Sequence, residues 1–304
     1  MIDIIAIGEA LVELNQKAPG EAFTPGFGGD TSNVAVAAAR CGAKAAYVSA
    51  VGADRFGQSL LDLWAREGVD ATHVKVNGGA HTGIYFVSHG PQGHEFSYMR
   101  AGSAASRMSE ADMPADAIRA ARALHVSGIS QAISSSAADA IFEAIAIARQ
   151  AGRLVSYDPN LRLKLWPLTR ARAIIHEAMR HCDVALPGFD DAVQLTGLSQ
   201  PDAIADFYLK LGARVVALTL GAAGALVATA QRREAAPAPR VAAVDATGAG
   251  DAFDGAFLCE YLATGDAFGA GRFAVAAAAL STTGYGAIAP LPTRAQALAA
   301  QAPP

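Results

Sequence analysis

The sequence predicts an α/β fold, in which a doubly wound, mostly parallel sheet carries a small antiparallel β lid. Short apolar runs that end at a glycine or a polar residue are typical of buried parallel strands, and segments with helical spacing follow most of them. A third observation predicts the lid, since several strand-like segments early in the chain have no long helix between them. In such sheets, ligands bind at the carboxyl ends of the strands.

The first strands and helices of the main sheet can be placed from these patterns. Continuous apolar runs predict buried strands at 2–7 and 45–51. The segment 34–40 consists of small residues without a polar face, which predicts a buried helix. We expect Asp30 or Thr31 to cap this helix, because both side chains can accept a hydrogen bond from a free backbone N–H group.

The lid is expected to come from two insertions in this region. Residues 11–14 and 21–27 flank Pro19-Gly20, a turn signal, and predict a hairpin outside the main sheet. Further short strands follow before the next regular helix. We therefore expect lid strands at about 11–27 and 74–100, the second insertion comprising 74–76, 83–88 and 95–99.

From about residue 117, strands and helices alternate regularly. This rhythm predicts that residues 1–304 form one domain around a mostly parallel sheet. Residues 231–240 are expected to be a surface connection. The expected strands are 123–127, 154–158, 184–186, 215–220 and 225–228, and the expected helices are 137–150, 169–181, a short one from 190, 201–211, and one from 294.

Composition favours a small-molecule ligand. Of the 304 residues, 52% are hydrophobic and 17% are charged, which leaves ample material for a buried core. The net charge of −4 and the absence of any block of Lys or Arg argue against nucleic acid as a partner. The three cysteines are far apart and odd in number, so neither a disulfide framework nor a zinc site is expected.

The same features predict a cytoplasmic location. The apolar run at the N-terminus contains an Asp and has no basic region before it, so it resembles a strand more than a signal peptide. Alanine-rich helices such as 273–280 are too short to span a bilayer, and we expect no membrane contact.

The turn at 245–251, Asp-Ala-Thr-Gly-Ala-Gly-Asp, is the strongest chemical signal. It leads into 252–262, where aromatic and aliphatic residues at helical spacing predict an amphipathic helix. Backbone N–H groups at Gly248, Ala249 and Gly250 would lie at that helix's N-terminus, where an anion such as phosphate binds. Asp251 could be a helix cap, or it could take a proton from a hydroxyl group beside the bound phosphate. The turn alone leaves both roles open.

A second glycine turn, Gly28-Gly29, also begins a helix and is followed by Asn33. By itself it could be a tight turn with a polar helix start. Together the two turns resemble the signature regions of the ribokinase-like (PfkB) carbohydrate kinases. The resemblance covers essentially the whole chain and implies ATP-dependent phosphorylation of a sugar hydroxyl, with Asp251 as general base and the amides of 248–251 as the anion hole.

Within that family, further segments resemble the branch that phosphorylates 2-keto-3-deoxygluconate. A sugar acid carries a carboxylate, which guanidinium groups bind through paired, charge-assisted hydrogen bonds. The segments are 28–31, 82–85, 96–100, 127–129 and 158–162 with Trp166, and the substrate-binding residues that they imply are Gly29, Asn33, Tyr85, Tyr98, Arg100, Ile129 and Arg162. From its position alone, Arg100 could equally be a solvated side chain at a strand end, and the two tyrosines could be ordinary cross-strand aromatics.

The resemblance also implies a nucleotide site and a metal ion. Thr219, Gly221 and Gly224 resemble the strand and turn that border the nucleotide, although a simple hairpin would look similar. The family usually has Asn, two residues, then Glu near magnesium, whereas this chain has Gly188 and Asp191. Asp191 can still hold a metal-bound water, so Mg²⁺ and ATP are expected.

Two further properties of relatives are possible here. A monovalent cation could bind at Asp245, Thr247 and the loop 284–290, but the Asp-x-Thr pattern fits a helix-entry turn better. Exposed lid strands have edges that usually need covering, which predicts a homo-oligomer joined through the lid.

Three other functions remain as alternatives to a sugar-acid kinase. The nearest is the same chemistry on a neutral sugar such as ribose or fructose. A sugar or nucleotide sensor without catalysis would not need Asp251 beside an intact Gly-Ala-Gly turn. A dinucleotide oxidoreductase is disfavoured because no Gly-x-Gly-x-x-Gly turn follows Gly8.

Overall fold

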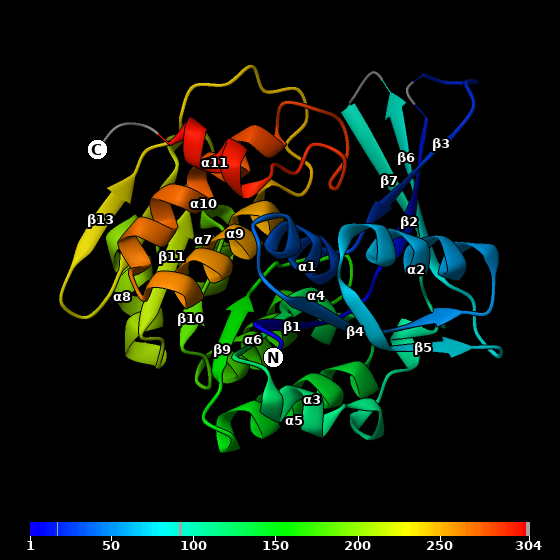
Figure 1. Ribbon diagram of the computed structural model, residues 1–304, viewed down its shortest axis with the longest axis horizontal. Helices are drawn as coiled ribbons and strands as arrows, with labels where there is room; N and C mark the ends of the chain where they lie inside the picture. The colour runs from blue at the N-terminus through cyan, green and yellow to red at the C-terminus, as the bar shows by residue number, and fades with distance from the viewer. Residues whose placement is uncertain (17, 91–92, 302–304) are drawn as a thin grey trace.

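Figure 1 shows the computed structural model, which describes residues 1–16, 18–90 and 93–301, as a large sheet flanked by helices with a smaller sheet projecting from one side. Within these residues the large sheet has nine strands in the order β13-β12-β11-β10-β9-β8-β1-β4-β5. All neighbours pair in parallel except β11–β12 and β12–β13. The predicted doubly wound, mostly parallel sheet is confirmed. Its strands are β1 (Ile4–Ile7), β4 (Ala45–Gly52), β5 (Asp70–Asn77), β8 (Ala123–Ser127), β9 (Leu154–Asp158), β10 (Val184–Ala185), β11 (Val215–Thr219), β12 (Ala225–Ala228) and β13 (Arg233–Ala236).

Helices cover both faces of this sheet, and the helix layer on each face packs on the sheet to form a separate hydrophobic core. Along β1 the buried side chains alternate, with Ile4 and Ala6 in one core and Ile5 and Ile7 in the other. The continuous apolar run is therefore explained by burial on both faces. One layer contains α1 (Asp30–Arg40), α2 (Arg55–Glu67), α9 (Ala249–Thr264), α10 (Ala267–Ser281) and α11 (Arg294–Ala300), and the other contains α3 (Ala115–Ala120), α4 (Gly128–Ala132), α5 (Ser135–Gln150), α6 (Leu168–Met179), α7 (Phe189–Thr196) and α8 (Pro201–Leu211).

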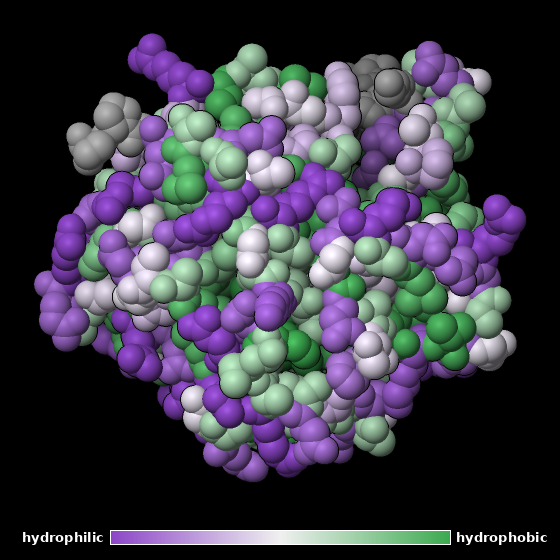
Figure 2. Space-filling view, viewed as in Figure 1, coloured by the Kyte–Doolittle hydropathy of each residue, from purple (hydrophilic) through white to green (hydrophobic). Residues whose placement is uncertain are grey.

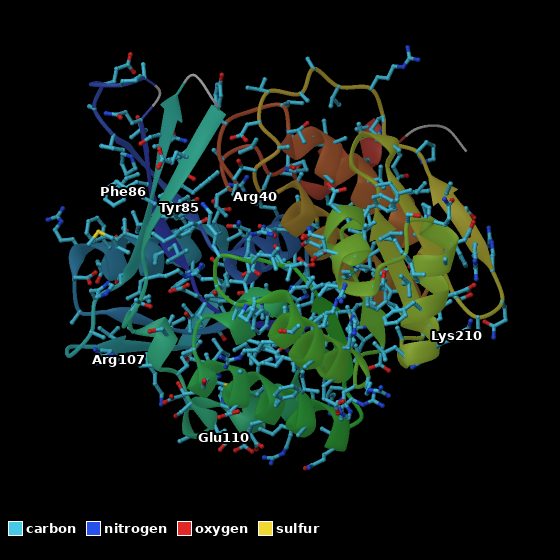
Figure 3. The ribbon with its side chains drawn as sticks, turned by 180° about the vertical axis from the view of Figure 1, so that it is seen from behind. Arg40, Tyr85, Phe86, Arg107, Glu110 and Lys210 are labelled. Carbon is cyan, nitrogen blue, oxygen red and sulfur yellow. The ribbon has the colours of Figure 1, made fainter. Side chains whose placement is uncertain are left out.

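The smaller sheet is the lid. Among the described residues it has four strands in the order β3-β2-β6-β7: β2 (Leu11–Gln16), β3 (Thr24–Gly28), β6 (Gly83–Gly90) and β7 (Gly93–Met99). Two of its pairings are antiparallel, but β2 and β6 run parallel, so the sheet is mixed rather than purely antiparallel. Strands β3 and β7 form its edges. Tyr85 and its neighbour Phe86 lie on opposite faces of β6 (Figure 3). Tyr85 is buried in a cluster of lid residues with Leu11 and Val87.

Two expected assignments outside the site are wrong. Residues 74–76 were expected in the lid, yet they belong to β5, which pairs in parallel with β4 at the edge of the large sheet. Helix α2 supplies the crossover that a parallel β4–β5 pair needs. Residues 231–240 were expected to be a connection, but β13 forms there because β12 offers it an unpaired edge.

Two expectations about helices also fail. The helix that follows the 245–251 turn is not amphipathic, since Ala252 to Cys259 are all buried between α1 and α10. Neither Asp30 nor Thr31 caps α1, because both lie inside the helix and Gly29 is its N-cap, with φ of 111°.

The outer surface of the molecule differs from the buried core in composition, because it also carries hydrophilic residues (Figure 2). On the face seen in Figure 2, hydrophilic and hydrophobic residues are intermixed over the helices. No helix in the described part of the chain combines the length and apolar character needed to cross a bilayer.

Candidate active site

A cavity of about 870 Å³ lies where the lid meets the carboxyl ends of the central strands. Its wall draws on the lid, the segments after β1 and β9, and the first turns of α1 and α9. The structure thus brings together residues as far apart in the chain as Glu9 and Ala287, as expected where the carboxyl ends of parallel strands meet. The predicted residues that line the cavity are Gly29, Asn33, Tyr85, Tyr98, Arg100, Ile129, Arg162, Asp191, Thr219, Gly248, Ala249, Gly250 and Asp251.

The N-terminus of α9 faces the cavity, but the N–H of Ala249 is already engaged, since it donates to the Ala246 carbonyl oxygen at 3.1 Å. Gly248 is the N-cap residue in a left-handed conformation (φ 74°), and no side chain caps the helix. A Cβ atom on Gly248 would lie 2.7 Å from the Cβ of Ala287, whereas a Cβ on Gly250 would have no atom within 4 Å. Gly248 is therefore needed for the turn, and the space beside Gly250 can receive an anion.

Asp251 lies in the first turn of α9 and is held by Asn33 from α1. The Asn33 Nδ2 donates a hydrogen bond of 2.7 Å to Oδ2 of Asp251. Burial, and secondly the negative charge of Asp30, raise the pKa of Asp251 to about 7, while the Asn33 hydrogen bond and Arg162 oppose the rise. A carboxylate with a pKa near neutrality is well suited to accept a proton from a hydroxyl group.

Further aspartates line the same cavity and were not predicted as site residues. They are Asp30, Asp158 and Asp254. Burial, followed by the neighbouring carboxylates, raises the pKa of Asp158 and of Asp254 well above the usual range. Asp254 as a whole residue is 2% exposed, and its Oδ2 has no hydrogen-bond partner among the described residues. Its position three residues after Asp251, on the same face of α9, is the sequence signal that could have identified it.

Arg100 lines the cavity, but its charge is already paired. Its Nη2 forms an ion pair with Oε2 of Glu9, whose side chain is fully buried. The Ser103 hydroxyl donates a second hydrogen bond, of 3.0 Å, to Oε1 of Glu9. Burial raises the pKa of Glu9, and the Arg100 charge opposes the rise. Glu9 was not predicted, although it follows the first strand at its carboxyl end, where ligand-binding residues are expected.

Arg162 is the more accessible guanidinium. Its side chain is 50% exposed, and its Nη1 lies 3.9 Å from Oδ2 of Asp191. That oxygen of Asp191 also accepts a hydrogen bond of 2.8 Å from the backbone N–H of Leu161. Burial raises the pKa of Asp191, and the Arg162 charge lowers it. Arg162 and Asp191 thus lie together on the cavity wall. This position is compatible with the predicted roles of Arg162 in substrate binding and of Asp191 in holding a metal-bound water.

The lid wall of the cavity is aromatic, and Gly28 makes room for it. Tyr85 donates a hydrogen bond to the buried Glu13, and the ring of Tyr98 stacks on Tyr85 with 5.8 Å between ring centroids. A Cβ on Gly28 would lie 2.5 Å from the Tyr85 hydroxyl, and a Cβ on Gly29 would lie 2.4 Å from a backbone oxygen. Both glycines are therefore required by close packing.

Two residues predicted at the nucleotide do not line the cavity. Gly221 begins a short 3-10 turn, and Gly224 is buried beneath β13. A Cβ on Gly224, whose φ is 99°, would lie 2.0 Å from the carbonyl oxygen of Ala236. Close packing against Ala236 is therefore sufficient to explain why a glycine stands at position 224. Thr219 does line the cavity, at the end of β11.

The Asp245 turn is held by its own hydrogen bonds. Asp245 Oδ1 accepts from the backbone N–H (2.9 Å) and the hydroxyl (2.6 Å) of Thr247, and Oδ2 accepts from the Gly286 N–H (2.9 Å). This geometry is that of a helix-entry turn, and a monovalent cation there stays a prediction. In the described ranges no group of three or more His, Cys, Asp or Glu side chains is arranged to hold a metal ion.

Known proteins resemble this chain over nearly its whole length. Residues 1–294 match the pfkB family of carbohydrate kinases. A 2-dehydro-3-deoxygluconokinase of Thermoproteus tenax is 37% identical over 290 residues, covering 92% of this chain and 88% of that relative. Fructokinase-2 of Solanum lycopersicum is 34% identical over 313 residues, covering 97% and 94% respectively.

Solved structures agree with these relatives. The PfkB protein from Polaromonas sp. JS666 superposes with a TM-score of 0.90 at 34% identity, covering 99% of this chain and all of that one (100%). A fructokinase with bound ATP from Xylella fastidiosa gives a TM-score of 0.90 at 27% identity, covering 98% and 97%. The ribokinase-like fold is confirmed. The family match and the identity to kinases over most of the chain lead to one conclusion: this protein belongs to the pfkB family of carbohydrate kinases.

Proposed function

We propose that this kinase transfers the γ-phosphoryl group of ATP to the primary hydroxyl of 2-keto-3-deoxygluconate, which gives the 6-phosphate. The main observation in favour is Asp251, a carboxyl group with a pKa of about 7 that Asn33 orients beside the uncapped N-terminus of α9. The relative from Thermoproteus tenax, named for this substrate under its synonym 2-dehydro-3-deoxygluconate, supports the choice of sugar.

In this proposal Asp251 acts as the general base. It accepts the proton of the sugar hydroxyl as the hydroxyl oxygen attacks the γ-phosphorus, and the bond from that phosphorus to the oxygen of ADP breaks. The amides at Gly250 and Asp251 stabilise the charge on the phosphoryl oxygens during transfer. Asn33 keeps the Asp251 carboxylate in one orientation throughout.

The residues present suit a magnesium ion bound together with the nucleotide. Mg²⁺ is commonly held by one or two carboxylates, with phosphates and water completing its coordination. Asp191 offers a carboxylate at the cavity wall that can hold a metal-bound water, and Gly188, which also lines the cavity, has no side chain to contribute. When bound, the ion would neutralise charge on the phosphates.

Recognition of the acid would rest mainly on Arg162. Its Nη1 donates a hydrogen bond of 2.9 Å to the Leu161 carbonyl oxygen and makes only a loose contact of 3.9 Å to Asp191. The other N–H groups of this half-exposed guanidinium can bind a substrate carboxylate. The tyrosines of the lid supply a flat wall for the sugar carbons, and Gly29, Asn33 and Ile129 line the rest of the sugar side.

A neutral sugar is the second candidate substrate. Two observations favour it: Glu9 already pairs with Arg100, which reduces the positive charge of the cavity, and a fructokinase is 34% identical to this chain. A sensor without catalysis finds no comparable support in the site.

A coupled ADP-release assay with a panel of sugar acids and neutral sugars tests the proposal. We expect 2-keto-3-deoxygluconate to give the highest kcat/KM, and a higher value for ribose or fructose would overturn this substrate. In the same assay Asp251→Asn should lower kcat at least about 100-fold without lowering the melting temperature. Near-normal turnover by that variant would remove Asp251 from the role of base.

A further inference from the structure

The ion pair between Glu9 and Arg100 joins the large sheet to the base of the lid. Glu9 follows β1 after one intervening residue, and Arg100 directly follows β7. The side chain of Glu9 is fully buried, and that of Arg100 is 12% exposed. Both residues line the cavity. The pair is therefore part of the wall that a bound sugar would face.

The surroundings of Glu9 fix its carboxylate in place. Oε1 accepts the Ser103 hydroxyl at 3.0 Å, and a Cβ on Gly83 would approach the same oxygen to 3.0 Å. Oε2 meets the Arg100 guanidinium, which also lies over the ring of Tyr98 with 5.6 Å to its centroid. Both partners are thus held with little room to move apart.

The pair brings no net charge to the cavity wall. The electrostatic attraction that a substrate carboxylate feels depends on the sum of all charges near it, and not on one guanidinium alone. Beside Arg100, the Glu9 carboxylate repels the same anion and cancels most of that attraction. Arg162 differs, because it is half exposed and its contact to Asp191 is a longer 3.9 Å.

We propose that Glu9 is a specificity-determining residue, which offsets the charge of Arg100 and so limits the preference of the cavity for anionic over neutral sugars. Arg162 is then the main cationic group for the carboxylate of an acid substrate. The inference rests on the proposed kinase activity toward sugars, but it does not require that the preferred sugar be the acid.

Glu9→Gln tests this role because glutamine keeps the shape of the side chain. Its amide oxygen can accept from Arg100 while its NH₂ group donates to the Ser103 hydroxyl. The readout is the ratio of kcat/KM for 2-keto-3-deoxygluconate to kcat/KM for fructose. We expect Glu9→Gln to raise this ratio by on the order of tenfold, since one negative charge leaves the wall of a partly desolvated site.

Glu67→Gln is the matched control. Glu67 also belongs to a partly buried ion pair, with Arg40, but it does not line the cavity. The control should keep the ratio of the wild-type protein within about twofold, because its charge is remote from the sugar. Melting temperatures of both variants show whether each has folded.

Should Glu9→Gln not fold, Arg100→Gln and the double variant Glu9→Gln/Arg100→Gln provide the same comparison. The double variant leaves neither charge buried alone, so its folding is easier to retain. Its ratio should exceed that of Arg100→Gln alone by a similar factor, whereas equal ratios overturn the proposal.

The remaining outcomes are also decisive. A folded Glu9→Gln with the wild-type ratio overturns the proposal, and so does an equal loss of kcat/KM for both sugars, which indicates a structural role only. If the wild-type protein phosphorylates fructose and not the acid, the proposed substrate fails. The inference about Glu9 then still requires the variant to gain turnover of the acid.

Discussion

Asn33 on α1 donates a hydrogen bond of 2.7 Å to Asp251 on α9, and so connects two helix N-termini that are 218 positions apart in the chain. Both helices begin at a glycine with positive φ and have no side-chain cap. The hydrogen bond favours the ionised carboxylate, whereas burial and Asp30 favour the protonated form. The protonation of Asp251 is therefore set by a balance that mutations can shift in either direction.

The first prediction concerns the pH dependence of turnover. The kcat/KM of the wild-type protein should rise with pH through about 7, as Asp251 loses its proton. Asn33→Ala removes the hydrogen bond that lowers the pKa, so this rise should move to higher pH. Asp30→Asn removes a negative charge and should move it to lower pH, each by on the order of one pH unit. Profiles that shift in the same direction would contradict this balance.

The second prediction concerns stability. The folded-state pKa of Asp254 lies well above the value of 3.8 for a free Asp, so the folded protein binds a proton that the unfolded chain releases as pH rises. Stability is consequently lost as pH increases from about 4 toward the folded pKa. Asp254→Asn abolishes this loss. We expect its free energy of unfolding to exceed that of the wild type by an amount that grows by roughly 1 kcal/mol with each pH unit across that window.

Urea unfolding of both proteins, without ligands, at a series of pH values measures this difference. The two curves should converge below about pH 3, where Asp254 is protonated in both the folded and the unfolded state. A constant difference at every pH would mean that asparagine acts through packing instead of charge.

The third prediction concerns Arg162. Arg162→Ala should raise KM for a sugar acid at least about tenfold, because a charge-assisted hydrogen-bonded pair is lost, and should affect KM for a neutral sugar much less. The melting temperature should hardly change, since a half-exposed ion pair contributes little stability. Replacing Arg100 as well should abolish turnover of the acid. Equal KM changes for both sugars would indicate that Arg162 acts on the nucleotide or on the wall as a whole.

The fourth prediction separates the two kinds of glycine. Gly250→Ala places its methyl group in open space beside the α9 amides, so we expect normal stability and an increase in KM for ATP of on the order of tenfold. Gly224→Ala forces a Cβ to within 2.0 Å of a carbonyl oxygen at φ 99° and should lower the melting temperature. A stable Gly250→Ala protein with unaltered KM for ATP would place the phosphates elsewhere.

Much of the site could be anticipated from residues next to predictable elements. The turn at 248–251 was recognisable because glycines and an acidic residue precede an apolar helix, and the cavity indeed collects Asp251, Asn33 and both arginines. The lid was anticipated from strands without helices, although 74–76 was wrongly included because an edge strand has the same local pattern in either sheet. The oligomeric state stays a prediction from the exposed lid edges.

The sequence by itself determined the alternation of strands and helices, and with it a parallel sheet whose carboxyl ends carry the candidate site, because periodicity and glycine turns are local properties. Only the tertiary structure decided which charged side chains of the cavity are already paired and which are accessible to a ligand. It pairs Arg100 with the buried Glu9, leaves Arg162 half exposed, and packs five aspartates around one cavity. Such pairings join distant positions, and the free energy of a charge depends on burial and neighbours that no local pattern contains.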